Sequence, residues 1–335
     1  DGKQVLGLKD DKKNMLAKVA YLYYFEEKTQ NEIAEELKIY RTTVSRMIKQ
    51  AKDEGIVKIE IQEFNTQIYA LERHMKSKYK LKDIEIVPVV ESDSNEKKNQ
   101  KLSKAAAAYI KRKIEMDSIV GVSWGETLGD TVAEIESKKK TNAMFVPIAG
   151  GPSHINSKYH VNTLVYEMAR KFSGQNIFVN ATVIQETPQL KKGIMDSKYF
   201  KELKDYWERL DIAIVGIGGP LRIRESQWRD LLTKEDYKDL ELREAVGDCC
   251  CRFFDHEGKM LKGNLYERTI GLDLYHLKKV PLSVGIARSK VKSKSILAML
   301  KKSYINCLIT DEETVLEILR LEKDPYLDTY QLKEI

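Results

Sequence analysis

Residues 29–55 read TQNEIAEELKIYRTTVSRMIKQAKDEG, and this stretch predicts two short amphipathic helices joined by a tight turn. Thr29 and Glu32 fit a capping box, in which the threonine hydroxyl accepts the Glu32 amide and the carboxylate reaches back to the threonine amide. The second helix begins near Arg41, after a three-residue connection, and ends at Gly55. Two helices connected in this way are typical of a helix-turn-helix.

The second of these helices carries the positive charge of the region. From Lys38 to Lys52 there are five basic residues and no acidic one. Its outer face offers arginines that can pair with guanine and hydroxyls that can reach bases or phosphates. A solvated basic face in a helical bundle is the alternative, but the capped first helix and the short turn favour DNA. The residues that we expect to contact DNA are Arg41, Thr42, Thr43, Ser45, Arg46, Lys49 and Lys52.

The segments around this motif complete a predicted N-terminal domain over residues 1–62. Residues 1–13 are polar and charged, which indicates a loose arm, and apolar residues at helical spacing follow between Leu16 and Tyr24. Residues 57–61 alternate between apolar and charged side chains, as a strand does. The domain is therefore predicted to be a winged or a plain helix-turn-helix.

Residues 63–82 are predicted as a linker helix between two domains. The apolar residues of this helix form one stripe, which is either a contact between two copies of the chain or a surface packed on its own domain. The stripe consists of Ile68, Leu71, Met75 and Tyr79.

From residue 83 to residue 335, segments with helical periodicity alternate with short apolar runs. Several of these runs are continuously apolar, as in strands that are buried on both faces of a parallel sheet. The clearest predicted strands are residues 84–87, 119–122, 144–148, 212–215, 282–286 and 307–309. The alternation predicts a Rossmann-like, mainly parallel α/β domain behind the all-α N-terminal domain, so the fold is assigned to the α/β class.

Composition restricts the class of protein further. The chain has 335 residues, enough for about two domains, and a net charge of +6 that weakly favours an anionic partner. No apolar run is long enough to span a bilayer, and the first residues do not resemble a signal peptide, so we expect a cytoplasmic protein with no membrane partner. Of the four cysteines, three are adjacent at residues 249–251, a spacing that predicts free thiols and no metal site.

Several blocks of the chain, taken in order, resemble the SorC family of sugar-responsive bacterial transcriptional regulators. Residues 29–46 are similar to that family's DNA-binding domain, and residues 121–128, GVSWGETL, to its phosphate loop. Further similar blocks lie at residues 147–151, 247–255, 268–271 and 308–312. The resemblance implies a Rossmann-like effector domain akin to sugar-phosphate isomerases, a phosphorylated sugar as effector, double-stranded operator DNA as partner, and assembly as a homodimer or homotetramer.

The chain departs from the family's pattern in two places. Glu126 stands where the family usually has an arginine or a small polar residue, which puts a carboxylate close to the expected phosphate. The family's Gly-Gly-x-x-Lys block aligns with residues 288–292, where Lys292 keeps its place but both glycines are replaced.

Local chemistry indicates an anion site in the same part of the chain. A turn from a strand into a helix at about residue 126 offers free amides and the positive end of a helix dipole. The dipole contributes roughly 0.3–2 kcal/mol, so a cationic side chain is needed as well. Glycines after strands lie where α/β sheets bind ligands, although most such glycines are only turns. The expected effector residues are Ser123, Gly125, Glu126, Thr127, Gly150, Gly151, Gly216, Gly218, Asp248 and Lys292. The resemblance places Lys292 opposite the phosphate and Asp248 opposite the sugar.

Two enzymatic alternatives compete with this interpretation. Residues 121–125, GVSWG, fit the G-x-S-x-G nucleophile elbow of α/β-hydrolases, and the fold shared with sugar-phosphate isomerases would allow that activity. An esterase needs an acid and a histidine downstream, where the candidates are His256, in a polar turn, and His276. An isomerase would not need a helix-turn-helix, and no acid–base pair stands out. We therefore expect a regulator rather than an enzyme, with no cofactor apart from its effector.

Overall fold

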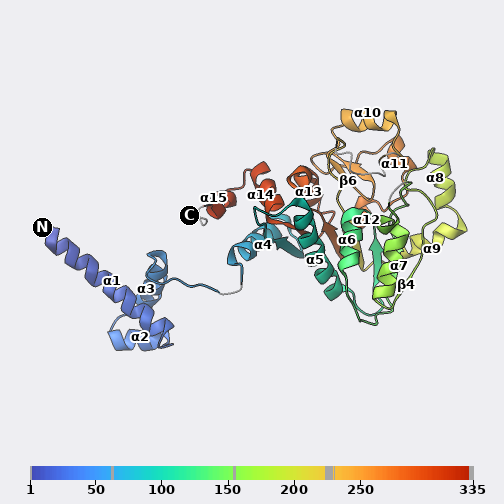
Figure 1. Cartoon of the computed structure of the whole chain (residues 1–335). Helices are drawn as coiled ribbons and strands as arrows, with labels where there is room; N and C mark the ends of the chain where they lie inside the picture. Colours follow the sequence, from blue (N-terminus) through green and yellow to red (C-terminus); the bar gives the residue numbers. More distant parts are fainter. Residues whose placement is uncertain (1, 62–63, 154–155, 223–228, 230, 332–335) are drawn as a thin grey trace. The chain divides into compact units, whose positions relative to one another are not determined.

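The computed structural model describes the chain except for residues 1, 62–63, 154–155, 223–228, 230 and 332–335 (Figure 1). The chain divides into two compact units, residues 1–66 and residues 67–335. Each unit is built around buried hydrophobic residues of its own.

The first unit contains three helices, α1 (Gly2–Tyr24), α2 (Gln30–Leu37) and α3 (Arg41–Asp53). Each helix contributes one apolar stripe to a shared core, because its apolar residues recur every three or four positions. The buried core residues are Leu16, Val19, Ala20, Leu22, Ile33, Val44, Ile48 and Ala51. The helix-turn-helix predicted from residues 29–55 is therefore confirmed as α2 and α3.

The loose arm predicted for residues 1–13 is wrong for residues 2–13, which form the first half of α1. The segment contains no proline, and its helical backbone runs without a break into the buried stripe that begins at Leu16. Once packing has nucleated a helix, each further residue adds one more backbone hydrogen bond. Polar composition is therefore compatible with a helical extension of this kind.

The start of α2 and the end of α3 have the capping residues that were predicted from the sequence. Thr29 Oγ1 accepts the Glu32 amide at 3.3 Å, and the Glu32 carboxylate accepts the Thr29 amide at 2.7 Å, which completes the capping box. Lys38 ends α2 in the left-handed conformation, with φ of 51°. Gly55, with φ of 71°, follows the end of α3, where a glycine avoids the strain that a side chain would cause.

The strand predicted at residues 57–61 is absent, so the described part of the first unit has no wing. The Val57 amide donates to the Ala51 carbonyl at 3.0 Å, which extends the end of α3, and Ile59 and Ile61 are more than half exposed. A strand needs a neighbour to satisfy its backbone groups, and the described residues of this unit include no other strand. Alternation alone was therefore insufficient to make a strand.

The second unit is built on a seven-stranded sheet in which all neighbouring strands are parallel (Figure 1). The strand order is β1-β9-β8-β5-β2-β3-β4. The strands are β1 (Asp83–Val87), β2 (Ile119–Val122), β3 (Met144–Pro147), β4 (Gln175–Asn176), β5 (Ile212–Gly216), β8 (Leu282–Ile286) and β9 (Cys307–Asp311). All six predicted strands are confirmed to within two residues. The two-residue β4 and the hairpin of β6 (Gly247–Cys249) with β7 (Arg252–Phe254) were not predicted.

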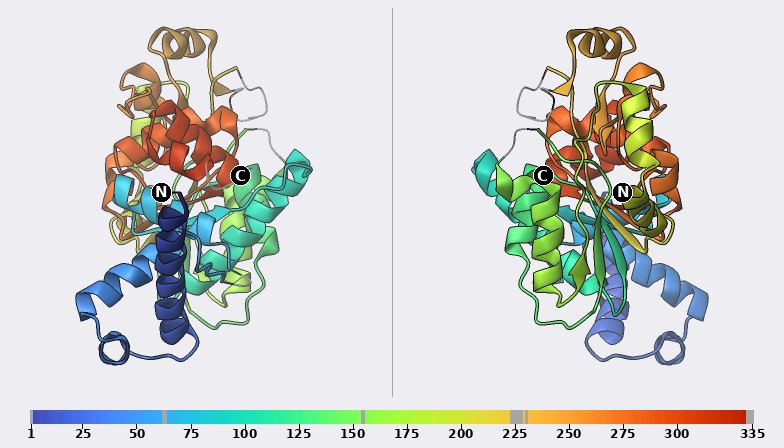
Figure 2. Two further views of the ribbon diagram at one scale, coloured as in Figure 1. Left: turned by 90° about the vertical axis from the view of Figure 1, so that its left-hand side faces the viewer. Right: turned by 90° about the vertical axis from the view of Figure 1, so that its right-hand side faces the viewer.

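Helices cover both faces of this sheet (Figure 2), as in doubly wound proteins. The helices of the second unit include α5 (Asn95–Lys113), α6 (Glu126–Glu134), α7 (Val161–Lys171), α8 (Pro188–Met195), α9 (Lys198–Trp207), α10 (Lys234–Leu242), α11 (Asn264–Arg268), α12 (Leu274–Lys279), α13 (Ser293–Lys301), α14 (Glu312–Leu321) and α15 (Tyr326–Gln331). Helix α6 packs between α5 and α7. Among the described residues, no helix is long and apolar enough to cross a membrane.

Helix α4 (Thr66–Tyr79) belongs to the core of the second unit. Ile68, Leu71 and Met75 are buried in the main hydrophobic cluster, and Tyr79 packs against it. Of the two alternatives left open for this stripe, packing on its own domain is therefore correct, and a contact between copies through these residues is not. Both arrangements require the same apolar spacing, which is why the sequence did not distinguish them.

The winding of the sheet reverses between β2 and β5. From β2 the chain continues to β3 and β4 on one side, whereas β5 leads to β8 and β9 on the other. In open α/β sheets, ligands bind at the carboxyl ends of the strands at such a switch point, because the loops there diverge. The fold therefore points to the segments that follow β2 and β5.

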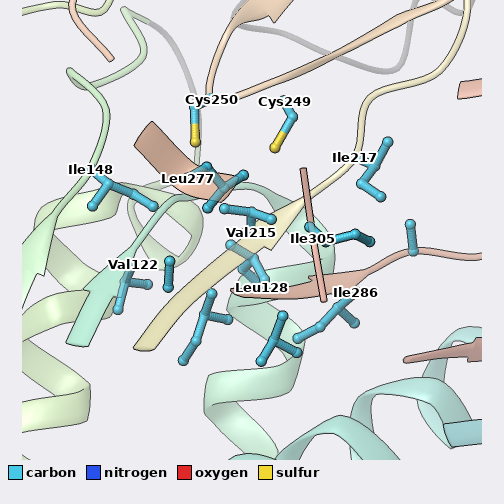
Figure 3. Packing of buried hydrophobic residues seen from close by; sticks show 14 of the residues in the cluster. Val122, Leu128, Ile148, Val215, Ile217, Cys249, Cys250, Leu277, Ile286 and Ile305 are labelled. Carbon is cyan, nitrogen blue, oxygen red and sulfur yellow. The ribbon is translucent and has the colours of Figure 1, made fainter. Parts of the chain in front are cut away.

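Apolar side chains pack directly beneath this edge of the sheet. Figure 3 shows Val122, Val215 and Ile286, from three strands, in one cluster toward which the sulfur atoms of Cys249 and Cys250 point. All four cysteines are free and buried. A hydrogen bond with Cys250, together with burial, raises the pKa of the Cys249 thiol, so that it packs as a neutral group.

Candidate DNA-binding face and effector site

The polar face of α3 carries the side chains that were predicted to contact DNA. Thr43 is half-buried, and the other six residues of that set are exposed. Lys52 Nζ lies 5.7 Å from the centre of the Tyr24 ring. Among the residues that the structure describes, no ion pair involves Arg41, Arg46, Lys49 or Lys52. All four charges are therefore available to phosphates and base edges.

Helix α3 begins without a side-chain cap. Tyr40 occupies the N-cap position, makes no capping hydrogen bond and is 83% exposed. A serine or asparagine at this position would typically stabilise a helix by about 0.5–2 kcal/mol. An exposed tyrosine at the start of the basic helix instead offers a hydroxyl beside the predicted DNA-contacting residues.

The loop after β2 has the local features of an anion site. Gly125, the N-cap of α6, has φ of 128°, and no atom lies within 4 Å of the position that a Cβ would take. Its own amide donates to the Tyr159 carbonyl at 3.2 Å. Since glycine has no capping side chain, the amides of Glu126, Thr127 and Leu128 have no hydrogen-bond acceptor among the described residues.

Neighbouring segments fix this loop in place. The Ser123 amide donates to the Ile214 carbonyl of β5 at 3.1 Å, and the buried Trp124 indole donates to the Gly150 carbonyl at 2.8 Å. Ser123 is 6% exposed, and in the described part of the chain its hydroxyl has no hydrogen-bond partner. A hydroxyl that is not engaged within the protein can donate to a bound group, so Ser123 is a candidate ligand donor.

Glu126, the acidic departure from the family's pattern, has an exposed side chain in the first turn of α6. Solvent and salt screen a charge in such a position efficiently. The carboxylate can therefore be close to the loop in sequence without a strong repulsion of a bound anion.

The predicted glycines lie at the same edge of the sheet but differ in their surroundings. A Cβ on Gly150 would lie 2.6 Å from the Val183 Cα, and one on Gly151 would lie 2.6 Å from the His160 ring. Gly216, at the end of β5, borders open space. Gly150 and Gly151 therefore allow close packing, whereas Gly216 leaves room at the switch point.

Asp248 has a partner that the sequence did not reveal. Arg229 donates to Asp248 Oδ1 at 3.0 Å, and both side chains are more than nine-tenths buried. The backbone of Asp248 also pairs with the backbone of Gly218 in an antiparallel β-bridge. A Cβ on Gly218 would lie 2.1 Å from Asp248 Oδ1. One oxygen of Asp248 is thus already engaged within the protein.

Lys292 lies in the loop between β8 and α13, at the carboxyl edge that also carries the β2 loop. Ser289, one of the residues that replace the family's glycines, has φ of 114°, which glycine adopts far more readily than serine. Its amide donates to Thr314 Oγ1 at 2.9 Å, and its carbonyl accepts the Lys292 amide at 3.0 Å. The glycine-type geometry is therefore kept without the glycine.

A second buried ion pair anchors the same loop. Arg288 Nε donates to Asp311 Oδ2 at 2.7 Å, and Arg288 also donates to Asn99 Oδ1 at 2.7 Å. Asp311 in turn caps α14 by accepting the Thr314 amide at 2.9 Å. These contacts join residues that are far apart in sequence, so no local pattern indicated them.

A helix-turn-helix joined to a doubly wound α/β domain defines the class of ligand-responsive DNA-binding proteins. Comparison with known families agrees. Residues 64–320 match the family described as "Putative sugar-binding domain", and residues 27–58 match a winged helix-turn-helix DNA-binding family. The chain belongs to the SorC-type family of sugar-binding transcriptional regulators.

Known relatives resemble the chain over most of their length. It is 35% identical to the sorbitol operon regulator of Klebsiella pneumoniae over 91% of this chain and 98% of the relative. The full-length crystal structure of that regulator has a TM-score of 0.73. The deoxyribonucleoside regulator of Bacillus subtilis is 28% identical over 91% and 96% of the two chains. A transcriptional regulator from Streptococcus pneumoniae is 44% identical, with a TM-score of 0.75, over 77% and 99%.

Proposed function

We propose that this transcriptional regulator changes its affinity for operator DNA when a phosphorylated sugar binds to residues 123–127. The observation that carries the proposal is the uncapped start of α6, where three amides without acceptors among the described residues follow Gly125. Free amides and the helix dipole together attract an anion. The loop adjoins the switch point of the sheet, where ligands of this fold class bind.

The remaining parts of the proposed site divide between phosphate and sugar. Hydroxyl groups of Ser123 and Thr127 donate to the phosphate, and Lys292 supplies the positive charge that the dipole alone does not provide. The open space beside Gly216 accommodates the sugar. The second carboxylate oxygen of Asp248 accepts from a sugar hydroxyl, while the first holds Arg229.

The protein acts by binding rather than by catalysis in this proposal. Among the described residues, Ser123 has no hydrogen bond to a histidine, which the esterase alternative would require. Two copies related by a two-fold axis bind a pseudo-palindromic operator, because protein symmetry and half-site symmetry then match. The effector shifts the population between arrangements that differ in DNA affinity.

Isothermal titration calorimetry with the full-length chain tests the effector class. Sorbitol 6-phosphate and deoxyribose 5-phosphate are suitable probes, since the relatives regulate sorbitol and deoxyribonucleoside operons. At least one phosphorylated probe should bind, and its unphosphorylated counterpart should bind far more weakly. Thr127→Ala should weaken binding, whereas Thr127→Ser keeps the hydroxyl and should retain it. Equal affinity for a sugar and its phosphate would refute the proposed phosphate site.

A further inference from the structure

His160 is the N-cap of α7 and lies against the loops that form the proposed effector site. Its Nδ1 accepts the Asn162 amide at 3.1 Å. The preceding residue, Tyr159, accepts the Gly125 amide through its carbonyl at 3.2 Å. A backbone hydrogen bond thus connects the segment that carries His160 directly to the N-cap of α6.

The capping bond determines which ring nitrogen of His160 carries the proton. An N–H that donates to Nδ1 requires a lone pair there, so the neutral ring must have its hydrogen on Nε2. Burial lowers the pKa of His160, which favours this neutral form. The side chain therefore presents one N–H donor, from Nε2.

The Nε2 atom lies on the side of the ring that faces Gly151. A Cβ on Gly151 would be 2.6 Å from Nε2 and 2.9 Å from Cε1, so only glycine leaves space for the ring. No residue that the structure describes accepts a hydrogen bond from Nε2. Because the ring is only half-buried, the Nε2–H group is open to an acceptor from solvent or from a ligand.

We propose that His160 Nε2–H is a hydrogen-bond donor to the phosphate group of the effector. The inference rests on the proposed function. It adds a contact from the segment between β3 and α7 to the contacts that the amides of α6 make with the phosphate. A bound phosphate would then be held between the first turn of α6 and the N-cap residue of α7. A neutral donor also adds no charge to the site, so Lys292 remains the cation in this arrangement.

Two substitutions separate the capping role of His160 from the proposed donor role. Asparagine is among the best N-cap residues, so His160→Asn preserves the start of α7 but lacks a group that reaches the Nε2 position. His160→Gln places a side-chain N–H2 near the Nε2 position and loses the cap. The first variant should keep the melting temperature of the wild type, whereas the second should lower it.

Calorimetry at pH 7.5 with the phosphorylated sugar that binds wild type, and with inorganic phosphate as a competitor, tests the donor. A hydrogen bond to a charged acceptor predicts about 10- to 100-fold weaker binding of both probes to His160→Asn. His160→Gln should recover part of this loss despite its lower melting temperature. Unchanged affinity in His160→Asn would overturn the inference, and so would a loss confined to the sugar phosphate, which would place the donor on the sugar instead.

The design distinguishes failure of this inference from failure of the proposed function. If wild type binds neither sugar phosphate nor phosphate, the proposed function itself is wrong. If wild type and Thr127→Ser bind, Thr127→Ala does not, and His160→Asn binds like wild type, only the role of His160 is refuted.

Discussion

Arg229 and Asp248 form an ion pair at 3.0 Å in which less than a tenth of either side chain is exposed. Removal of one partner from such a pair leaves an uncompensated buried charge, which typically costs about 3–5 kcal/mol. Asp248→Ala should therefore lower the free energy of unfolding by about this amount, measured by urea denaturation of the ligand-free protein. The double variant Arg229→Met, Asp248→Leu should recover most of the loss. A single-variant loss below about 1 kcal/mol would contradict a stabilising role for the pair.

Ser289 should be destabilising because of its backbone conformation. Its φ of 114° is one that non-glycine residues rarely adopt, and glycine would remove the steric strain. We expect Ser289→Gly to raise the free energy of unfolding by about 1 kcal/mol. Ser289→Ala is the matched control, because it removes the same hydroxyl and keeps the strain. Equal stability of the glycine and alanine variants in thermal denaturation would show that the backbone is unstrained.

Glu72, on α4, makes stability dependent on pH. Burial raises the pKa of its carboxyl to about 7, an effect that outweighs a hydrogen bond from the Ile86 amide. The folded protein therefore binds this proton more tightly than the unfolded chain does, so stability falls as pH rises from about 4.5 to about 7. Because the group is only partly buried, we expect Glu72→Gln to stabilise the protein by about 1–2 kcal/mol at pH 8. Urea denaturation should show no difference at pH 4.5, and a gain of the same size at both pH values would exclude the titration.

Arg46 and Lys49 should contribute differently to DNA binding. An arginine that pairs with guanine discriminates by about 1–3 kcal/mol, whereas a lysine that contacts phosphate acts on every sequence. Arg46→Ala should therefore weaken operator binding more than binding to random DNA. Lys49→Ala should weaken both equally and reduce the salt slope by about one. Fluorescence anisotropy at several salt concentrations measures these effects, and the same loss from both variants on both DNAs would disprove the division.

The sequence was sufficient for most of the fold because the relevant signals are local. Continuous apolar runs predicted the parallel strands, and Thr29 with Glu32 predicted the start of α2. The β6–β7 hairpin gave no such signal, since its turn consists of Cys250 and Cys251 with φ of 50° and 60°, where asparagine and glycine would be expected. The strand predicted at residues 57–61 had the correct alternation but no partner strand.

The candidate site was predictable only in part, because only some of its contacts are local in sequence. A strand, a glycine and a helix that follow one another in sequence are sufficient to indicate the loop at Ser123–Thr127. The ion pair of Arg229 with Asp248 and the contact of His160 with Gly151 depend instead on tertiary packing between distant segments. Neither contact has a spacing or a motif by which the sequence could have indicated it.

The measurement that tests the account most directly is operator affinity with and without the effector. Fluorescence anisotropy should use full-length protein, operator DNA obtained by binding-site selection, and the phosphorylated sugar that binds in calorimetry. Saturating sugar phosphate should change the operator Kd by about 5- to 150-fold in wild type and in Thr127→Ser. The unphosphorylated sugar should leave it unchanged, and Thr127→Ala should not respond at the same concentration. An operator Kd that is identical with and without saturating sugar phosphate would contradict the account.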